Sequence, residues 1–115
     1  MSTKVRALIV SPTEDPYVAT VSTGSLQELV GGFLELVWLS HDIHAYVNEE
    51  GRFMDLPVNI RGSDIVNRFR QETTSCSTSE DEEEYLGTMI FLSMDAQGDE
   101  KSLTDKQLAR IGIDV

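Results

Sequence analysis

The sequence predicts an α+β fold, with one small domain over residues 1–115 in which a mixed sheet of about five strands, with a central hairpin, is packed by two or three short helices. Two observations support this class. Leu, Ile, Val and Phe supply 32 of the 115 residues, well above the roughly 20% below which a highly charged chain stays disordered. Strand-like runs also alternate with helix signals, in the order strand, strand, helix, strand, strand, brief strand, helix, strand, helix.

The first two strands are predicted from an apolar run and the residues that end it. Residues 4–10 carry apolar side chains at both odd and even positions, so this strand is expected in the sheet interior, with both faces covered. Ser11 and Pro12 end it. After a short loop, Tyr17 to Val21 forms a second strand that is able to pair with the first.

A short helix is predicted next. Ser25 and Glu28 match a capping box, in which the Ser oxygen accepts from a free amide and the Glu side chain reaches back to the cap. Gly31 and Gly32 then end the helix after about two turns, because Gly adopts the left-handed conformation of a helix end.

A hairpin is predicted from the two apolar runs Phe33–Leu39 and Ile43–Val47, since the three residues between them suit a tight connection. Both faces of the first run carry apolar residues, and one face is broken only by Glu35. One face of the hairpin therefore needs a cover beyond the first helix. Two covers fit, namely the later helices or a second copy of the chain.

The next segment is predicted to contain a turn, a brief strand and a helix. Residues 48–51 have turn chemistry, and residues 52–56 form the brief strand, which Pro57 ends. Ser63 is the predicted cap of a helix that ends near Gln71.

The last two elements are a strand and a helix. Residues 86–94 are apolar at both parities and are expected to form another interior strand. Thr104 and Gln107 make a second capping box, and Gly112 closes the helix that it starts.

Charge is segregated along the sequence. The chain holds 9 Lys and Arg against 20 Asp and Glu, a net charge of -11. Residues 72–84 are rich in Ser, Thr and acids, and are predicted to form a flexible loop. Five consecutive acids close this loop and are the predicted partner-binding residues: Glu80, Asp81, Glu82, Glu83 and Glu84. Two interpretations stay open, a solvated loop tethered to nearby arginines or an acidic arm that binds a partner.

Composition argues against several classes of function. Direct binding to nucleic acid is disfavoured, because phosphate contacts need cations and acids outnumber bases here by two to one. No stretch approaches the roughly 20 apolar residues of a transmembrane helix, so no membrane contact is expected. The lone Cys76 leaves no partner for a disulfide within the chain, which favours a reducing cytoplasm.

No motif for catalysis or for metal binding emerges. His41 and His44 are expected to be turn and surface residues, and Cys76 lies far from them in the sequence. Glu49 and Glu50 are adjacent acids in a turn, where they keep the hairpin end soluble more readily than they act as an acid/base pair. No cofactor is therefore expected, and no phosphate-binding loop is present.

The elements Val-Gly-Gly-x-x-Glu at 30–35, Asn-Glu-Glu-Gly at 48–51 and Leu-Pro-x-Asn at 56–59 resemble a family of small uncharacterised domains encoded mainly by bacteriophages and plasmids. The resemblance covers most of residues 4–95 and implies an origin but no activity. It also implies a common surface, whose candidate residues are Asn48, Glu49, Gly51, Pro57 and Asn59. Each of these also has a turn or strand-ending explanation, and the acidic loop departs from the family pattern.

These observations predict a non-enzymatic accessory protein of phage or plasmid type that binds a host protein in the cytoplasm. An acidic inhibitor that imitates DNA is one version of this prediction. The alternative is a small-ligand-binding domain or minor enzyme with a pocket between residues 48–51 and 56–59. A third reading takes the acid excess as adaptation to a salty cytoplasm. A homodimer is left open.

Overall fold

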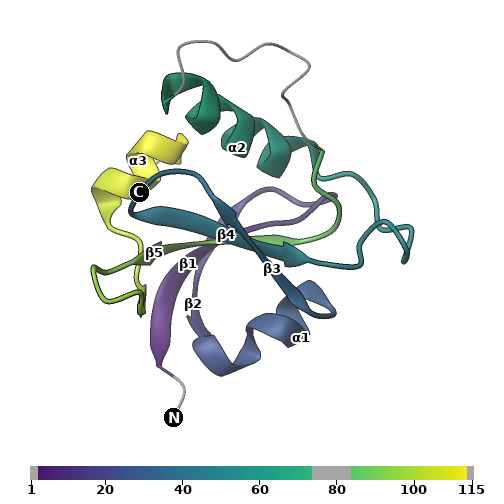
Figure 1. The fold of residues 1–115 in the computed structure, drawn as a ribbon, viewed down its shortest axis with the longest axis horizontal. Coiled ribbons are helices and arrows are strands. Elements are labelled where there is room, and N and C mark those ends of the chain that lie inside the picture. Colours follow the sequence, from purple (N-terminus) through teal and green to yellow (C-terminus); the bar gives the residue numbers. More distant parts are fainter. Residues whose placement is uncertain (1–2, 74–83, 114–115) are drawn as a thin grey trace.

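The computed structural model describes residues 3–73 and 84–113, which form one sheet with helices on both faces (Figure 1). In chain order the elements are β1 (Lys4–Val10), β2 (Tyr17–Ser22), the 3-10 turn η1 (Thr23–Ser25), α1 (Leu26–Val30), β3 (Leu34–Trp38), β4 (Ile43–Asn48), α2 (Ile60–Thr73), β5 (Met89–Met94), β6 (Glu100–Lys101) and α3 (Asp105–Ile111). The α+β class is confirmed. The predicted flexible loop lies almost entirely outside the described residues.

The sheet has the strand order β2-β1-β5-β4-β3, and β6 pairs with the end of β5. Every pairing between these strands is antiparallel. Two predictions were therefore wrong: the sheet is not mixed, and the β3–β4 hairpin lies at one edge rather than at the centre. The middle position belongs to β5, which separates the β1–β2 pair from the β3–β4 hairpin.

The two faces of the sheet have different covers (Figure 1). We call the face under α2 and α3 the first face; its core includes Leu8, Val37, Ala45, Phe91, Ile65, Phe69 and Leu108. The second face lies against α1, and its core includes Val5, Ala7, Ile9, Ile90, Leu92, Leu26 and Val30. The alternation along β1 and β5 supplies both cores, as expected for interior strands. Within residues 3–73 and 84–113, no helix has the length and apolarity needed to cross a membrane.

Three local predictions were wrong. Ser25 makes no side-chain cap, because the preceding residues form a 3-10 turn and its backbone lacks the extended geometry of a cap. The predicted strand over residues 52–56 is absent: residues 52–55 form turns, closed by a bond from Met54 N to the Glu50 carbonyl, with Asp55 at φ 52°. The long helix starts at residue 60 instead of after Ser63.

Other predicted ends are confirmed. Thr104 and Gln107 form the capping box of α3, in which each side chain bonds the other's backbone amide. Gly31 ends α1 and Gly112 ends α3, and both have positive φ. The prediction that the first and second strands pair is also confirmed.

Asn59 precedes α2 and ties three segments together. Its Nδ2 donates to the carbonyls of Val10, at 2.7 Å, and Gly87, at 2.9 Å. Its Oδ1 accepts from the amide of Gly62 at 2.9 Å, which caps the helix. Ser63, which the sequence suggested as the cap, accepts instead from the amide of Tyr85 at 2.8 Å. The start of α2 is therefore fixed to the end of β1 and to the segment that enters β5.

Candidate functional site

A recess opens where the β3–β4 hairpin meets the turn after β4 and the segment before β5. Its volume is about 110 Å³. We call it the acidic recess and define it by its lining residues, Glu35, Val47, Asn48, Glu49, Gly51, Arg52, Phe53, Glu84, Tyr85 and Leu86. Three carboxylates and one guanidinium thus line a small hollow.

The turn after β4 is held in place by Asn48, which is 5% exposed. Its Oδ1 accepts from the amide of Glu50 at 2.8 Å, and its Nδ2 donates to the carbonyl of Val30 at 3.3 Å. Gly32 passes close to this amide group, since a Cβ there would lie 2.9 Å from Nδ2. The wall of the recess is therefore anchored to the end of α1.

The opposite wall is fixed by contacts with the segment before β5. Gly51 packs on Leu86, and a Cβ at Gly51 would lie 3.2 Å from that side chain. The amide of Gly87 donates to the carbonyl of Pro57 at 2.8 Å, beside the bridge between Val58 and Leu86. These backbone contacts hold both sides of the recess at a fixed separation.

The structure brings together residues from two separate predictions. Asn48, Glu49 and Gly51 of the predicted family surface line the recess with Glu84, the last of the five predicted partner-binding acids. Pro57 and Asn59 do not line it: Pro57 supplies the backbone bond to Gly87, and Asn59 is fully buried. The other four predicted acids, residues 80–83, lie outside the described residues.

Sequence reasoning did not select Glu35, Arg52, Phe53 and Tyr85 as site residues. A signal existed for Glu35, the one charge that interrupts an apolar strand run. No comparable signal marked Phe53, because it lay in a segment predicted as a strand, where an aromatic residue is ordinary. In the structure its side chain is 90% exposed.

Several acids of the chain pair with a cation, but the recess carboxylates, like Glu14, Glu28 and Asp64, have no such partner among the described residues. Asp15 pairs with Arg61 at 2.7 Å, and Asp105 pairs with Arg6 at 2.8 Å. Within the described part of the chain, Glu35, Glu49 and Glu84 have no such ion pair. Their charge is therefore available to a ligand.

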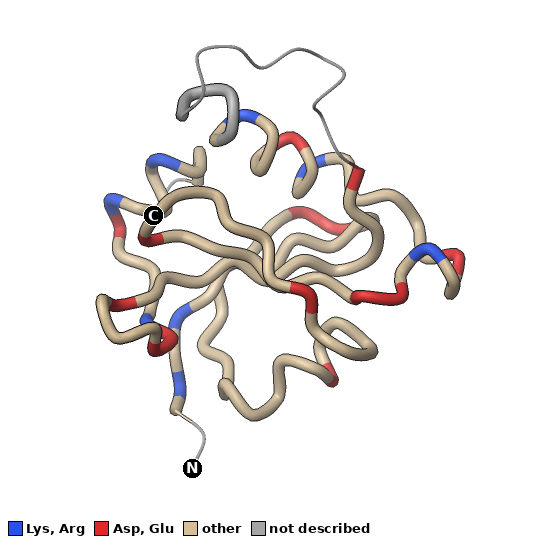
Figure 2. Tube along the Cα trace, in the orientation of Figure 1, with Lys and Arg blue, Asp and Glu red and all other residues tan. Residues whose placement is uncertain are grey.

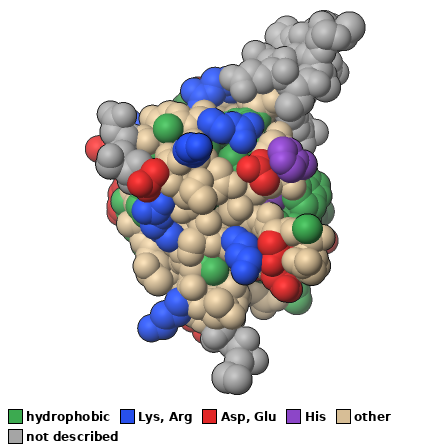
Figure 3. All heavy atoms as spheres, turned by 90° about the vertical axis from the view of Figure 1, so that its left-hand side faces the viewer, with side chains coloured by type: hydrophobic (Ala, Val, Ile, Leu, Met, Phe, Trp, Pro, Cys, Tyr) green, Lys and Arg blue, Asp and Glu red, His purple; other side chains and the backbone are tan. Residues whose placement is uncertain are grey.

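Charge is also divided in space. Lys and Arg gather near α3 and the start of β1, whereas acids cluster near the turn after β4, at the right of Figure 2. Figure 3 shows the first of these regions as a surface on which blue and red side chains lie side by side. Ion pairs there join Lys101 to Asp95 at 3.6 Å and Arg110 to Asp42 at 3.6 Å. Acids near the recess therefore have fewer basic neighbours than those near α3 among the described residues.

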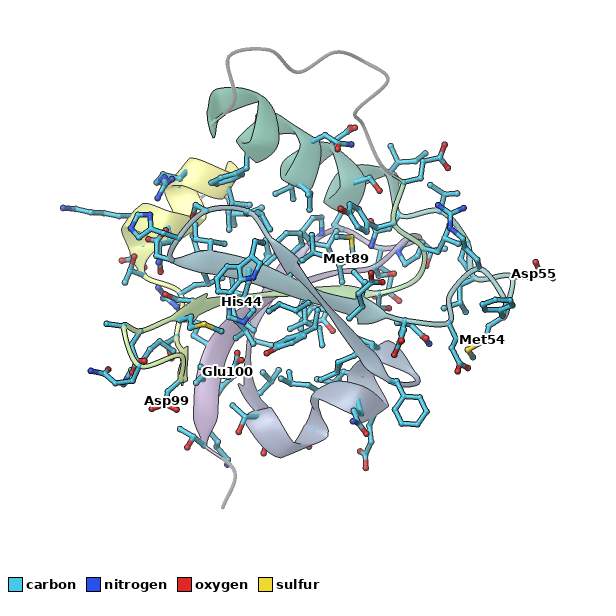
Figure 4. All side chains as sticks on the ribbon, in the orientation of Figure 1. His44, Met54, Asp55, Met89, Asp99 and Glu100 are labelled. Atoms are coloured by element: carbon cyan, nitrogen blue, oxygen red, sulfur yellow. The ribbon has the colours of Figure 1, made fainter. Side chains whose placement is uncertain are left out.

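A second polar cluster lies on the second face of the sheet, away from the recess. His44 on β4 is fully buried, so the prediction that both histidines lie in turns or on the surface was wrong for this residue. Its Nε2 lies 3.0 Å from Glu100 Oε2, and the Tyr46 hydroxyl donates to the other oxygen of Glu100. Figure 4 shows Glu100 beside His44 at the end of the sheet where β6 lies. This cluster fastens the short strand β6 to β4.

The cluster predicts a pH dependence of stability. Burial raises the pKa of Glu100. Hydrogen bonds from His44 and Tyr46 and the charge of His44 lower this pKa by more than burial raises it, so the net pKa lies below the ordinary 4.5. A carboxyl with a lowered pKa stabilises the fold above its ordinary pKa, and this contribution is lost as the pH falls through the folded value. Glu100→Gln should lower stability at pH 7 by about 1–2 kcal/mol and flatten the loss of stability below pH 4.5.

Urea denaturation from pH 7 to pH 2 measures this effect. Asp99→Asn is the matched control, because Asp99 is the neighbouring carboxyl, is exposed, and has no hydrogen bond through its side chain among the described residues. Asp99→Asn should leave the loss of stability below pH 4.5 unchanged. An equal loss of stability below pH 4.5 in Glu100→Gln and the wild type would contradict the lowered pKa of Glu100.

A metal site and a cationic ligand place different requirements on the recess residues. Among residues 3–73 and 84–113, no group of three or more His, Cys, Asp or Glu is placed to hold a metal ion. Carboxylates beside an exposed aromatic ring suit a ligand that carries a positive charge, because the carboxylates pair with it and the ring face attracts it.

Comparison with known families gives one match. A family model described as a domain of unknown function (DUF3846) matches residues 5–113. No curated protein and no solved structure matches the chain significantly. The expectation of a family without assigned function is confirmed, while its phage or plasmid origin stays a prediction.

Proposed function

The chain belongs to the DUF3846 family of domains of unknown function, and we propose that it is a non-enzymatic binding module that receives a basic segment of another protein at the acidic recess. The observation that carries the proposal is the set of unpaired carboxylates of Glu35, Glu49 and Glu84 around one hollow. Three negative charges around one hollow attract a positively charged group. A Lys or Arg side chain from a partner supplies such a group.

The size of the recess favours a side chain over a metabolite. Sites for small molecules usually have about 300–1,000 Å³, whereas the acidic recess has about 110 Å³. That space suits one Lys or Arg side chain from a larger partner. The alternative of a small-ligand pocket between residues 48–51 and 56–59 is therefore the weaker proposal, and residues 56–59 do not line the recess.

Exposed apolar side chains beside the recess offer a partner additional contact area. Phe53 and Met54 are exposed, at 90% and 49%, in the turn that forms one rim. Met54 lies far out on this turn, away from the sheet (Figure 4). Aromatic residues and methionine are enriched at protein interfaces, where their burial stabilises a complex.

The nature of the partner follows from charge and from the resemblance to mobile-element domains. A net charge of -11 attracts basic partners and raises the rate of encounter. A phage or plasmid origin makes that partner a host protein in the cytoplasm, and a nucleic-acid-binding protein fits best, with the module imitating DNA. The other acids of the run, Glu80, Asp81, Glu82 and Glu83, would add negative charge for the same partner.

Neutralising the recess is expected to weaken binding to basic peptides. The variant Glu35→Gln/Glu49→Gln/Glu84→Gln should bind a labelled Lys- and Arg-rich peptide about tenfold more weakly, because three partly exposed ion pairs of about 0.5 kcal/mol each are lost. Fluorescence anisotropy at low and high salt measures the affinity, and the salt dependence should shrink with the loss of charge.

A matched control separates the site from the net charge. Glu14→Gln/Glu28→Gln/Asp64→Asn changes the same number of exposed carboxylates elsewhere and should weaken binding no more than about twofold. A further variant with residues 80–83 neutralised and Glu84 kept tests the acidic run alone. Equal weakening by the recess and control variants would refute a defined site.

A further inference from the structure

We propose that β3 is the pairing strand of a symmetric dimer, in which it forms an antiparallel ladder with β3 of a second copy of this chain. β3 is an edge strand, and within the described residues it pairs only with β4. An edge strand presents unpaired amides and carbonyls that a further strand can bond. This inference is independent of the function proposed for the acidic recess.

The hydrogen bonds of the hairpin show which backbone groups of β3 point outward. The amide of Glu49 donates to the Phe33 carbonyl at 2.8 Å, and the amide of Leu39 donates to the Ile43 carbonyl at 3.0 Å. Residues alternate along an antiparallel ladder between inward and outward bonding. The outward amides and carbonyls therefore belong to Leu34, Leu36 and Trp38.

The same three residues place their side chains on the second face, where Leu34 packs at the margin of the core beside α1 and the other two are more exposed. Leu36 is 40% and Trp38 is 46% exposed, while the alternate residue Val37 is buried in the core of the first face. The Trp38 ring packs against the buried ring of His44, with 5.7 Å between ring centroids. Exposed apolar side chains therefore lie in a row along an open edge, which is an association surface.

The pattern is symmetric about Leu36, and this symmetry selects a second copy as the occupant. With a two-fold axis at Leu36, each Leu34 pairs with the other copy's Trp38, and the two Leu36 residues pair with each other. All outward groups of the three residues are then bonded, and apolar side chains meet on one face. A two-fold interface needs this self-complementarity.

Charge selects this register over the one centred on Glu35. Moving the axis by one residue would bring the two Glu35 carboxylates directly opposite each other, which is unfavourable in a ladder. With the axis at Leu36, each Glu35 faces Val37 instead. Because each copy carries a net charge of -11, dimerisation should strengthen as salt screens the repulsion, whereas binding of a basic partner should weaken.

Leu36→Pro tests the ladder directly. The Leu36 amide points away from β4, so a proline removes an outward donor while the β3–β4 bonds remain, as tolerated on edge strands. Sedimentation equilibrium of the full chain at about 0.05 M and about 0.5 M salt should show dimers of the wild type, tighter at high salt. The variant should dimerise at least tenfold more weakly, with unchanged circular dichroism.

Two further variants control for the possibility that Leu36→Pro misfolds. Trp38→Lys keeps the backbone intact and should also weaken the dimer at least tenfold. Leu29→Lys, which alters an exposed apolar residue on α1, should leave the dimer unchanged. A wild type that stays monomeric at every concentration and salt, or a dimer that Trp38→Lys does not weaken, would overturn the proposal.

Cross-linking tests the register. In a Cys76→Ser background, Leu36→Cys should form an intermolecular disulfide on oxidation with diamide. Its Cα atoms would lie about 5.5 Å apart across the axis, within the usual disulfide range. Glu35→Cys should not cross-link, because its nearest counterpart is a Val37. Cross-linking at residue 35 without cross-linking at residue 36 would reject the proposed axis.

Discussion

Replacing Asn59 with Ala is expected to lower the free energy of unfolding by about 4 kcal/mol, because it removes one helix cap and the donors of two buried bonds. The carbonyls of Val10 and Gly87 would each lose a partner, and the amide of Gly62 would lose its cap. The cost is high because Asn59 is fully buried, and water cannot replace the lost bonds without a cavity large enough to admit it.

Urea denaturation followed by circular dichroism measures this loss. Asn59→Asp is an informative second variant, since it keeps the oxygen that caps α2 but sets a carboxylate against the two carbonyls. It should destabilise the chain at neutral pH and recover part of the loss in acid, where the carboxyl is protonated. The loss of a cap alone costs about 1 kcal/mol. A smaller fall than this in the free energy of unfolding of Asn59→Ala would contradict the role of Asn59 in tying three segments together.

Gly62→Ala is expected to destabilise the protein by about 2 kcal/mol, although Ala normally favours a helix over Gly by about 1 kcal/mol. The reason is a close approach: a Cβ on Gly62 would overlap the sulfur of Met89 and lie 3.1 Å from the side chain of Asn59. Met89 is fully buried on β5 beneath α2 (Figure 4). The absence of a side chain at Gly62 therefore lets the first turn of α2 rest on the sheet.

Thermal and urea denaturation test whether Gly62→Ala destabilises the protein instead of stabilising the helix. Asp64→Ala, at an exposed position of the same helix, is the control and should change stability by less than about 0.5 kcal/mol. Combining Gly62→Ala with Met89→Ala should cost less than the sum of the single changes, because the smaller residue leaves room for the new methyl group. Stabilisation by Gly62→Ala alone would show that the helix sits farther from the sheet.

The strands were predictable because their signal is local. Alternating or continuous apolar runs over a few residues set the positions of β1, β3, β4 and β5. The position of the hairpin in the sheet was not predictable in the same way. It depends on β5 inserting between β1 and β4, and no short-range pattern encodes that order.

The start of α2 shows where local signals compete. Asn59 and Ser63 are both good helix caps, so sequence alone offered two starting points. The choice is made by contacts distant along the chain, since Asn59 reaches residues that are 49 and 28 positions away. Those bonds bury Asn59 at the cap and leave Ser63 inside the helix.

The candidate site was half predictable for a similar reason. Asn48, Glu49 and Gly51 form a continuous turn motif and Glu84 ends a conspicuous acidic run, so each was visible in the sequence. Their meeting in one recess depends on backbone contacts between residues 57 and 87. The pairing of His44 with Glu100, which are 56 positions apart, had no local signal at all.

The middle position of β5 also constrains how a nascent chain reaches this fold. Both hairpins can form early, but the strand that joins them leaves the ribosome last among the long strands. At ordinary rates of translation, the facing edges of β1 and β4 wait roughly several seconds for β5. During that interval two apolar edges stand open to other chains, and chaperone binding at this stage would favour the yield of folded protein.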